Sequence, residues 1–211
     1  MKKILLAVVL LIAVSVFTVG ACLYRRDNNS FFFPNAGSHV YNARFSEFSE
    51  RSDQKIELQV TKTGNIENDV VYHLTWNADQ QVQDRYGTDR MDLGYFFVTE
   101  DKIYLIHEDI LSEEALTKEE LISMGTLVCQ EEEKKDALAP EEPGWHERIE
   151  ADGNIRKYYG YNTLTETGYY EQFVWEKGIG LIKYKSGYGA EADDMEVDLV
   201  KKTPTLLLKV I

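Results

Sequence analysis

The chain has 211 residues, which suits one domain or two small ones, and its formal net charge is −13, from 23 Lys and Arg against 36 Asp and Glu. Its hydrophobic content of 44% and aromatic content of 12% exclude a disordered chain. The acidity argues against a nucleic-acid partner, because phosphate recognition needs a basic surface, and two cysteines are too few for a disulfide-stapled scaffold.

The chain begins with a segment typical of export. Lys2 and Lys3 precede an unbroken apolar run from Ile4 to Val14, and small residues follow that run. A basic start, an apolar stretch and small residues form the layout of a secretory signal. Residues 1–21 are therefore predicted to be a signal peptide.

The apolar segment ends in Val19-Gly20-Ala21-Cys22, which resembles the lipobox of bacterial lipoproteins. The resemblance implies that a peptidase cuts before Cys22 and that its thiol carries a diacylglycerol, so Cys22 is the predicted lipid attachment site. Two alternatives stay open: an uncleaved transmembrane anchor, since Ile4 to Leu23 has nearly the ~20 residues that a spanning helix needs, and an ordinary signal peptide. All three possibilities place the body outside the cytoplasm, and a lipid anchor or a transmembrane anchor would hold it at the cell membrane.

Residues 22–36 are polar and loop-like, apart from Phe31, Phe32 and Phe33. We interpret this stretch as a tether between the membrane and the folded body. The three phenylalanines are expected to dock on the body, with insertion into the membrane interface as the alternative.

From residue 37 to residue 203 the dominant period of apolar residues is two, which predicts half-buried antiparallel strands. Alternation is clearest in residues 55–60, 70–76 and 195–199. Further β-rich segments are residues 92–99, 102–107, 145–150, 155–161, 168–176 and 179–184. Turn residues between them are Thr63-Gly64-Asn65, Glu100-Asp101, Asp152-Gly153-Asn154 and Lys177-Gly178. The predicted fold is mainly β, an antiparallel meander forming a curved sheet or half-barrel with one short helix, and residues 204–211 are a tail or a last strand.

The predicted helix begins with a capping-box pattern at Thr117 to Glu120 and stops before Gly125. It belongs to an acidic stretch, since Glu108 to Glu142 contains twelve acidic residues and three lysines. We interpret residues 108–143 as a helix and loop inserted into one continuous β domain, with two subdomains meeting there as the alternative.

Several short motifs have a simpler structural explanation. Ser52-Asp53-Gln54-Lys55 and Lys62-Thr63-Gly64 match strings of penicillin-binding proteins, but Lys55 starts a strand rather than standing one helical turn after the serine. The four histidines lack the spacing of a metal site, although His73 and His107 lie on strands that could be neighbours.

Two further features were weighed as sites. The acidic cluster of Glu191, Asp193 and Asp194 lacks the regular spacing of a calcium loop, so no metal and no cofactor are expected. Cys129 follows an apolar run, which predicts a buried structural thiol.

Aromatic residues crowd the C-terminal meander and supply the candidate contacts with a ligand or partner. Adjacent residues of a strand face opposite sides, so one residue of each tyrosine pair, 158/159 and 169/170, points away from the core. The candidate contact residues are Tyr158, Tyr170 and Trp175. The alternative is that these rings only pair across strands and stabilise the sheet.

The segment from Phe173 to Tyr184 resembles a hairpin that recurs near the ends of uncharacterised exported bacterial lipoproteins. Its two glycines, Gly178 and Gly180, permit the turn and a close backbone approach. The resemblance implies architecture only and no catalytic residues.

The expected function is that of a lipid-anchored, extracytoplasmic binding module, without enzymatic activity, for a small ligand, a glycan or a protein. One alternative is a hydrolase whose site is assembled across strands. The other is a membrane-tethered accessory or sensor subunit that uses the acidic stretch as its contact surface.

Overall fold

The computed structural model describes residue 30 and residues 32–47, 50–87, 89–106, 116–164, 168–189 and 193–200. The predicted signal peptide, Cys22, most of the tether, His107, Glu191 and residues 204–211 lie outside these ranges. No helix within them is long and apolar enough to cross a membrane.

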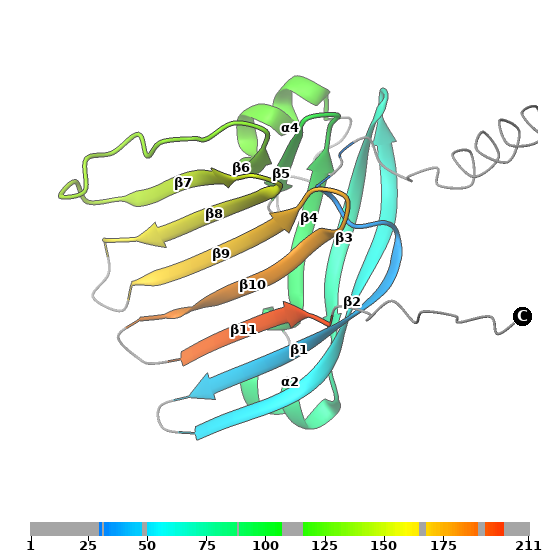
Figure 1. The fold of residues 1–211 in the computed structure, drawn as a ribbon, viewed down its shortest axis with the longest axis vertical. Coiled ribbons are helices and arrows are strands. Elements are labelled where there is room, and N and C mark those ends of the chain that lie inside the picture. Colours follow the sequence, from blue (N-terminus) through cyan, green and yellow to red (C-terminus); the bar gives the residue numbers. More distant parts are fainter. Residues whose placement is uncertain are drawn as a thin grey trace, which may run out of the picture.

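One curved antiparallel sheet of eleven strands contains every β-strand of the described chain, in the order β6-β5-β4-β3-β2-β1-β11-β10-β9-β8-β7 (Figure 1). The strands are β1 (Gly37–Glu47), β2 (Glu50–Ile66), β3 (Asp69–Asn77), β4 (Asp92–Val98), β5 (Lys102–Ile106), β6 (Thr126–Gln130), β7 (Trp145–Asp152), β8 (Ile155–Asn162), β9 (Tyr169–Glu176), β10 (Gly180–Tyr188) and β11 (Asp193–Leu199). The sheet bends until its two edges approach each other, so the predicted mainly-β, curved-sheet fold is confirmed.

Two expectations about the strands need correction. Thr63-Gly64-Asn65 is not a turn: β2 continues through it with a bulge between Lys62 and Gly64, and the turn comes at Glu67 and Asn68. A glycine in a strand often marks such a bulge. The acidic insertion also contributes to the sheet, because β6 lies within it. Strand β1 joins β2 to β11 and was not predicted from sequence.

The helix predicted after residue 117 is α4 (Lys118–Met124), and its capping box is confirmed. The Thr117 hydroxyl accepts a hydrogen bond from the Glu120 N–H at 3.3 Å, and the Glu120 carboxylate accepts one from the Thr117 N–H at 2.8 Å. The buried residue Leu121 packs the helix on the outer face of the sheet, against Phe97 and Ile106. A second helix, α2 (Gln80–Tyr86), and a 3-10 turn, η1 (Asp89–Met91), were not predicted.

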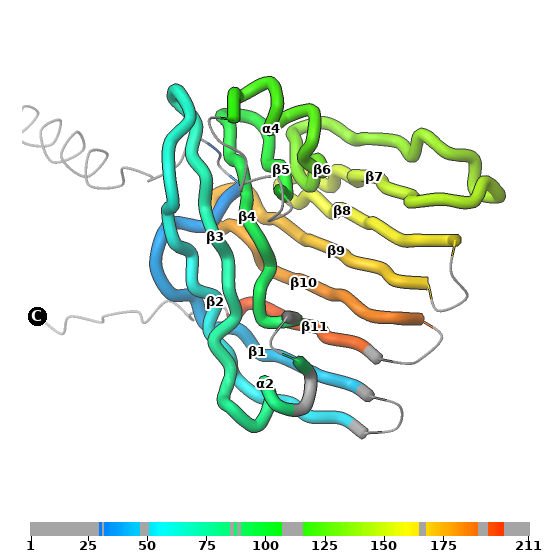
Figure 2. The backbone as a smooth tube through the Cα atoms, turned by 180° about the vertical axis from the view of Figure 1, so that it is seen from behind, coloured from blue at the N-terminus to red at the C-terminus, as the bar shows by residue number. Residues whose placement is uncertain are grey.

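The concave face of the sheet is filled by aromatic side chains. Phe33 is fully buried, and its ring lies 4.8 Å from that of Tyr72, 5.9 Å from that of Phe96 and 6.0 Å from that of Trp175. These partners belong to β3, β4 and β9, so one ring from the chain preceding β1 contacts both halves of the sheet. Figure 2 shows the backbone of the two halves from behind. The expectation that the phenylalanines dock on the body is confirmed for Phe32 and Phe33.

The two edges of the sheet, β6 and β7, meet without a continuous strand pairing, and chiefly side chains connect β6 to β7, β8 and β9. The Trp175 indole N–H donates to the Val128 carbonyl oxygen at 3.2 Å. The buried guanidinium of Arg156 donates to the carbonyl oxygens of Gln130 at 3.1 Å and Glu131 at 2.7 Å, and also pairs with the Glu131 carboxylate. These hydrogen bonds and the ion pair compensate for the free-energy cost of removing the Arg156 charge from water.

A loop of residues 131–144 pairs with the edge of β7 through an antiparallel bridge between Lys134 and Ile149, and a histidine fastens it. His146 is fully buried, with Nδ1 2.7 Å from the Asp136 carboxylate and Nε2 2.8 Å from the Glu142 carbonyl oxygen. Both ring nitrogens therefore face acceptors, which favours the doubly protonated imidazolium. The hydrogen bond to the Glu142 carbonyl, followed by the interaction with Asp136, raises the pKa of His146.

The predicted hairpin is formed by β9 and β10, and its glycines have separate roles. Gly178 lies in the turn with a φ of +89° and open space around it. Gly180 has a φ of +113°, and a Cβ at this position would lie 2.7 to 2.8 Å from atoms of Pro34. The predicted close backbone approach is therefore the approach of the segment before β1 to the start of β10.

Replacing Gly180 by alanine should destabilise the fold more than the same change at Gly178. Both variants strain a backbone of positive φ, which costs about 1 kcal/mol, whereas only Gly180→Ala also collides with Pro34, and such overpacking adds about 1–3 kcal/mol. Urea unfolding of the two variants and the wild type measures the difference. Equal losses in the two variants would show that Pro34 does not pack against this glycine.

Candidate functional site

The inner face of the sheet continues beyond the core at the end where β7 and β9 begin and β8 and β10 finish, which we call the open end (Figure 1). The register places three successive rows of side chains across these strands. The innermost row belongs to the core and consists of Ile149, Tyr158, Phe173 and Tyr184. The second row is Glu147, Gly160, Glu171 and Ser186. The outermost row contains Trp145, Tyr169 and Tyr188.

A cavity of about 330 Å³ lies at this end, and we call it the mouth cavity. It is lined by Arg90, Asp92, Tyr169, Tyr184, Ser186, Gly187 and Tyr188. The first two residues come from η1 and the start of β4, and the others come from β9 and β10, so the cavity spans the two halves of the bent sheet. Its volume falls at the lower end of the range for small-molecule sites, about 300–1,000 Å³.

Three aromatic rings form one wall beside the cavity. The Trp145 and Tyr169 rings lie 6.1 Å apart and nearly parallel, with an angle of 21° between their planes. The Tyr169 and Tyr188 rings follow at 5.4 Å, and Tyr188 is 37% exposed. The wall therefore offers aromatic surface that solvent and a ligand can reach.

Glu171 is an acid on the core-facing side of β9, between Tyr169 and Phe173 in the alternation. Burial raises the pKa of Glu171 from 4.5 to about 7. Near pH 7 a carboxyl group with this pKa is divided between its protonated and charged forms, and the protonated form can donate a hydrogen bond as well as accept one.

Tyr158 has a core ring but a hydroxyl that reaches the second row. The ring is fully buried, and the hydroxyl lies over Gly160, where a Cβ would come within 2.6 Å of it and within 2.4 Å of Trp145. No residue of the described chain forms a hydrogen bond of normal geometry with this hydroxyl. Burial and the charges of Glu171 and Glu147 raise the pKa of Tyr158, and the adjacent Trp145 side chain opposes this increase, so the hydroxyl stays protonated. The hydroxyl lies beside Trp145 and has no contact with solvent.

The charged residues around the mouth cavity are already matched. The Glu147 carboxylate forms an ion pair with the Lys134 ammonium group. Asp92 lies 2.9 Å from His73 Nε2 and also accepts a hydrogen bond from the Gly94 N–H at 2.7 Å. Arg90 takes part in interactions of its own.

The three predicted contact residues are not brought together. Trp175 is fully buried within the aromatic core, so it meets no partner at the surface. Tyr170 lies on the outer face, where its hydroxyl donates to Asp194 and Lys185 lies over its ring at 5.3 Å. Only Tyr158 takes part in the open end, through its hydroxyl. Sequence reasoning missed Glu171, Trp145 and Ser186, although Glu171 has the same strand parity as the core residues Phe173 and Trp175 and could have been found by that signal.

Other features weighed in the sequence have structural roles. Ser52 and Lys55 both lie on β2, and Cys129 is buried in the core as predicted, where burial raises the pKa of its thiol. His73 is occupied by Asp92, while His107 falls outside the described residues. Within the described ranges no three His, Cys, Asp or Glu side chains are grouped so as to hold a metal ion.

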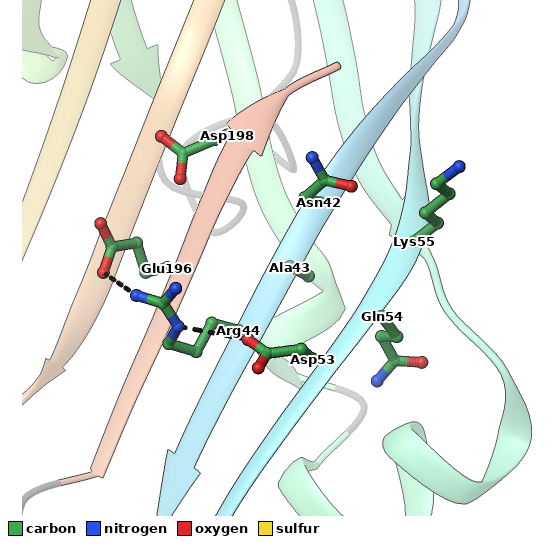
Figure 3. Close-up of a pocket in the computed structure, with 8 residues that line it drawn as sticks. All are labelled: Asn42, Ala43, Arg44, Asp53, Gln54, Lys55, Glu196 and Asp198. Atoms are coloured by element: carbon green, nitrogen blue, oxygen red, sulfur yellow. Dashed lines mark hydrogen bonds and ion pairs between the residues drawn. The ribbon is translucent and has the colours of Figure 1, made fainter.

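A second depression lies over β1, β2 and β11 and is formed by paired charges (Figure 3). Arg44 bridges Asp53 at 3.2 Å and Glu196 at 3.6 Å, and Lys183 also pairs with Glu196. Cross-strand pairs of opposite charge stabilise neighbouring strands. Since these charges satisfy one another, the depression is a weaker candidate than the mouth cavity.

No family model and no curated protein sequence matches this chain. Two solved structures resemble it: a candidate lipoprotein from Parabacteroides distasonis, with 10% identity over 82% of this chain and 98% of that one and a TM-score of 0.34, and a candidate exported protein with a YmcC-like fold from Bacteroides fragilis, with 11% identity over 81% and 97% and a TM-score of 0.33. Neither likeness is close enough to carry an argument about this chain.

Glu171→Gln should stabilise the protein above pH 7. In the wild type the folded state keeps a proton that the unfolded chain loses, so stability should decrease as the pH rises from about 4.5 to about 7. The glutamine variant lacks this decrease. Because solvent partly screens the charge of Glu171, the variant should be more stable than the wild type at pH 8 by about 2 kcal/mol.

Urea unfolding between pH 4.5 and pH 8 measures this difference. Glu150→Gln, on the outer face of β7, is the matched control and should follow the wild type. A wild-type profile parallel to that of Glu171→Gln would contradict the raised pKa of Glu171.

Proposed function

We propose that this protein is exported, is anchored through lipid on Cys22, and binds a small ligand in the mouth cavity. The proposed export and anchoring are supported by the sequence: a basic start, an apolar run and Val19-Gly20-Ala21 directly before Cys22. Two acyl chains on one cysteine give a stable anchor, because each buried CH₂ contributes about 0.8 kcal/mol.

The observation that carries the binding role is the combination of groups at the open end. Tyrosine rings and Ser186 line a cavity of about 330 Å³, and Glu171, whose pKa is raised to about 7, lies next to Ser186 in the same row. A concave site with a few convergent polar groups and a perturbed pKa is the usual form of a small-molecule site.

The position of the tether supports the same proposal. Phe32 to Pro34 pack beside Gly180 and the cations Arg156 and Lys177, at the end of β10 opposite to Tyr188. Only seven residues separate Cys22 from Ser30, so the anchored end of the body stays near the membrane. The mouth cavity at the other end then faces away from the membrane, where a ligand can reach it.

A hydrolase is the second candidate, and one observation favours it. Glu171, whose pKa is raised to about 7, and Glu147, which pairs with Lys134, flank Gly160 in one row. Two neighbouring carboxyl groups are the usual groups for general acid and base catalysis of hydrolysis. Turnover of a bound ligand that is lost in Glu171→Gln would distinguish the hydrolase from a binding module.

Lipidation of Cys22 is directly testable. Mass spectrometry of the membrane fraction should find a mature chain that begins at Cys22, with a diacylglycerol on its thiol. Cys22→Ala should remove the acyl chains and leave the signal uncleaved. If wild-type chains in that fraction still carry residues 1–21 and no lipid, the segment is a transmembrane anchor and the lipoprotein assignment is wrong.

Filling the mouth cavity should abolish ligand binding. Ser186→Phe places a ring in the cavity, whereas Lys185→Phe places the same ring on the outer face of the same strand. Saturation-transfer NMR against a library of small neutral, cationic and anionic ring compounds should detect binders of the wild type and of Lys185→Phe. At least tenfold weaker binding is expected in Ser186→Phe, and unchanged binding there would place the site elsewhere.

A further inference from the structure

We infer that the mouth cavity holds the ring of a neutral sugar, and this inference rests on the binding function proposed above. The mouth cavity is lined by aromatic faces and by hydrogen-bonding groups, which include one residue of each charge, Arg90 and Asp92. A sugar ring presents both kinds of surface, since it has flat patches of C–H groups and a rim of hydroxyls.

The aromatic wall provides the stacking surface. Trp145 and Tyr169 are nearly parallel, and Tyr188 extends the wall towards solvent. The electron-rich face of an aromatic ring attracts the weakly positive C–H groups of a pyranose. A saturated ring can therefore pack on this wall without giving up hydrogen bonds.

The polar groups favour a ligand that can both donate and accept. Ser186 and Tyr184 line the cavity with their hydroxyl-bearing side chains, and the Glu171 carboxyl group lies next to Ser186 on the neighbouring strand. A hydrocarbon ligand would cover such polar groups without offering them a hydrogen bond, at a cost of about 1–3 kcal/mol. Sugar hydroxyls can satisfy such a group in either direction.

The charge distribution favours a neutral ligand over an ion. Glu147 has Lys134 as its counterion, Asp92 is hydrogen-bonded to His73, and burial disfavours the charged form of Glu171. Arg90 and Asp92 contribute one charge of each sign to the cavity lining. An ionic ligand would be attracted by one of them and repelled by the other, and burying an unpaired charge is costly.

The test is saturation-transfer NMR on the full-length chain in a polyoxyethylene detergent, which carries no sugar headgroup. The probes are methyl β-D-glucopyranoside and methyl β-D-galactopyranoside as neutral sugars, sodium glucuronate as the anion and tetramethylammonium chloride as the cation. At least one neutral glycoside is expected to bind the wild type tenfold more tightly than either ion.

Adjacent tyrosines of β9 provide the matched variants. Tyr169→Ala removes a ring from the wall and should weaken glycoside binding at least tenfold, whereas Tyr170→Ala removes a ring from the outer face and should leave binding unchanged. Urea unfolding of each variant shows that it is folded.

The outcomes separate this inference from the proposed function. If tetramethylammonium or glucuronate binds more tightly than both glycosides and is lost in Ser186→Phe, the mouth is a ligand site but not a neutral-sugar site. If neither glycoside binds, or binding persists in a folded Tyr169→Ala protein, the inference is overturned. The library experiment with Ser186→Phe then decides separately whether the cavity binds any ligand.

Discussion

The fold depends on the aromatic cluster that closes the concave face of an incompletely closed sheet. Phe33 contacts the rings of Tyr72, Phe96 and Trp175, and Phe173 stacks on Trp175 with centroids 5.8 Å apart. Each aromatic side chain buries about 150–250 Å², which is more than any aliphatic side chain contributes. Because β6 and β7 do not form a continuous backbone ladder, these rings and the Arg156 hydrogen bonds take over the closure that pairing would provide.

The candidate site lies where this filling stops. Tyr158 and Tyr184 are the last core residues towards the open end, and both have a ring facing inward and a hydroxyl at the boundary. Beyond them the facing wall is short, with Arg90 in η1 and Asp92 at the start of β4, and the next row becomes polar. The same strands therefore supply an apolar core at one end and a cavity with polar lining at the other, and the pleat keeps both on one face.

The sequence predicts the strands well because a half-buried strand has a period that can be recognised without any partner. The joining of the two groups of strands into one sheet could not be predicted, since it depends on the pairing of β1 with β11, whose residues are more than 140 positions apart. The site was only partly predicted for the same reason. Adjacent tyrosines were correctly expected to face opposite sides, but the choice between Tyr169 and Tyr170 required knowing which side of β9 also carries Phe173 and Trp175.

Glu171 is the residue at which stability and the proposed function oppose each other. Its carboxyl group occupies a position that strand parity assigns to an apolar side chain, and burial destabilises its charged form. A leucine at position 171 would suit the fold. The neighbouring position on β8 is Gly160, where Trp145 and the Tyr158 hydroxyl occupy the space that a larger side chain would need. A carboxyl group, a glycine and an unpaired hydroxyl therefore adjoin one another in the same part of the sheet. Such local departures from the pattern of a well-packed strand are concentrated at sites of function, and here all three adjoin the row of side chains through which Ser186 reaches the mouth cavity.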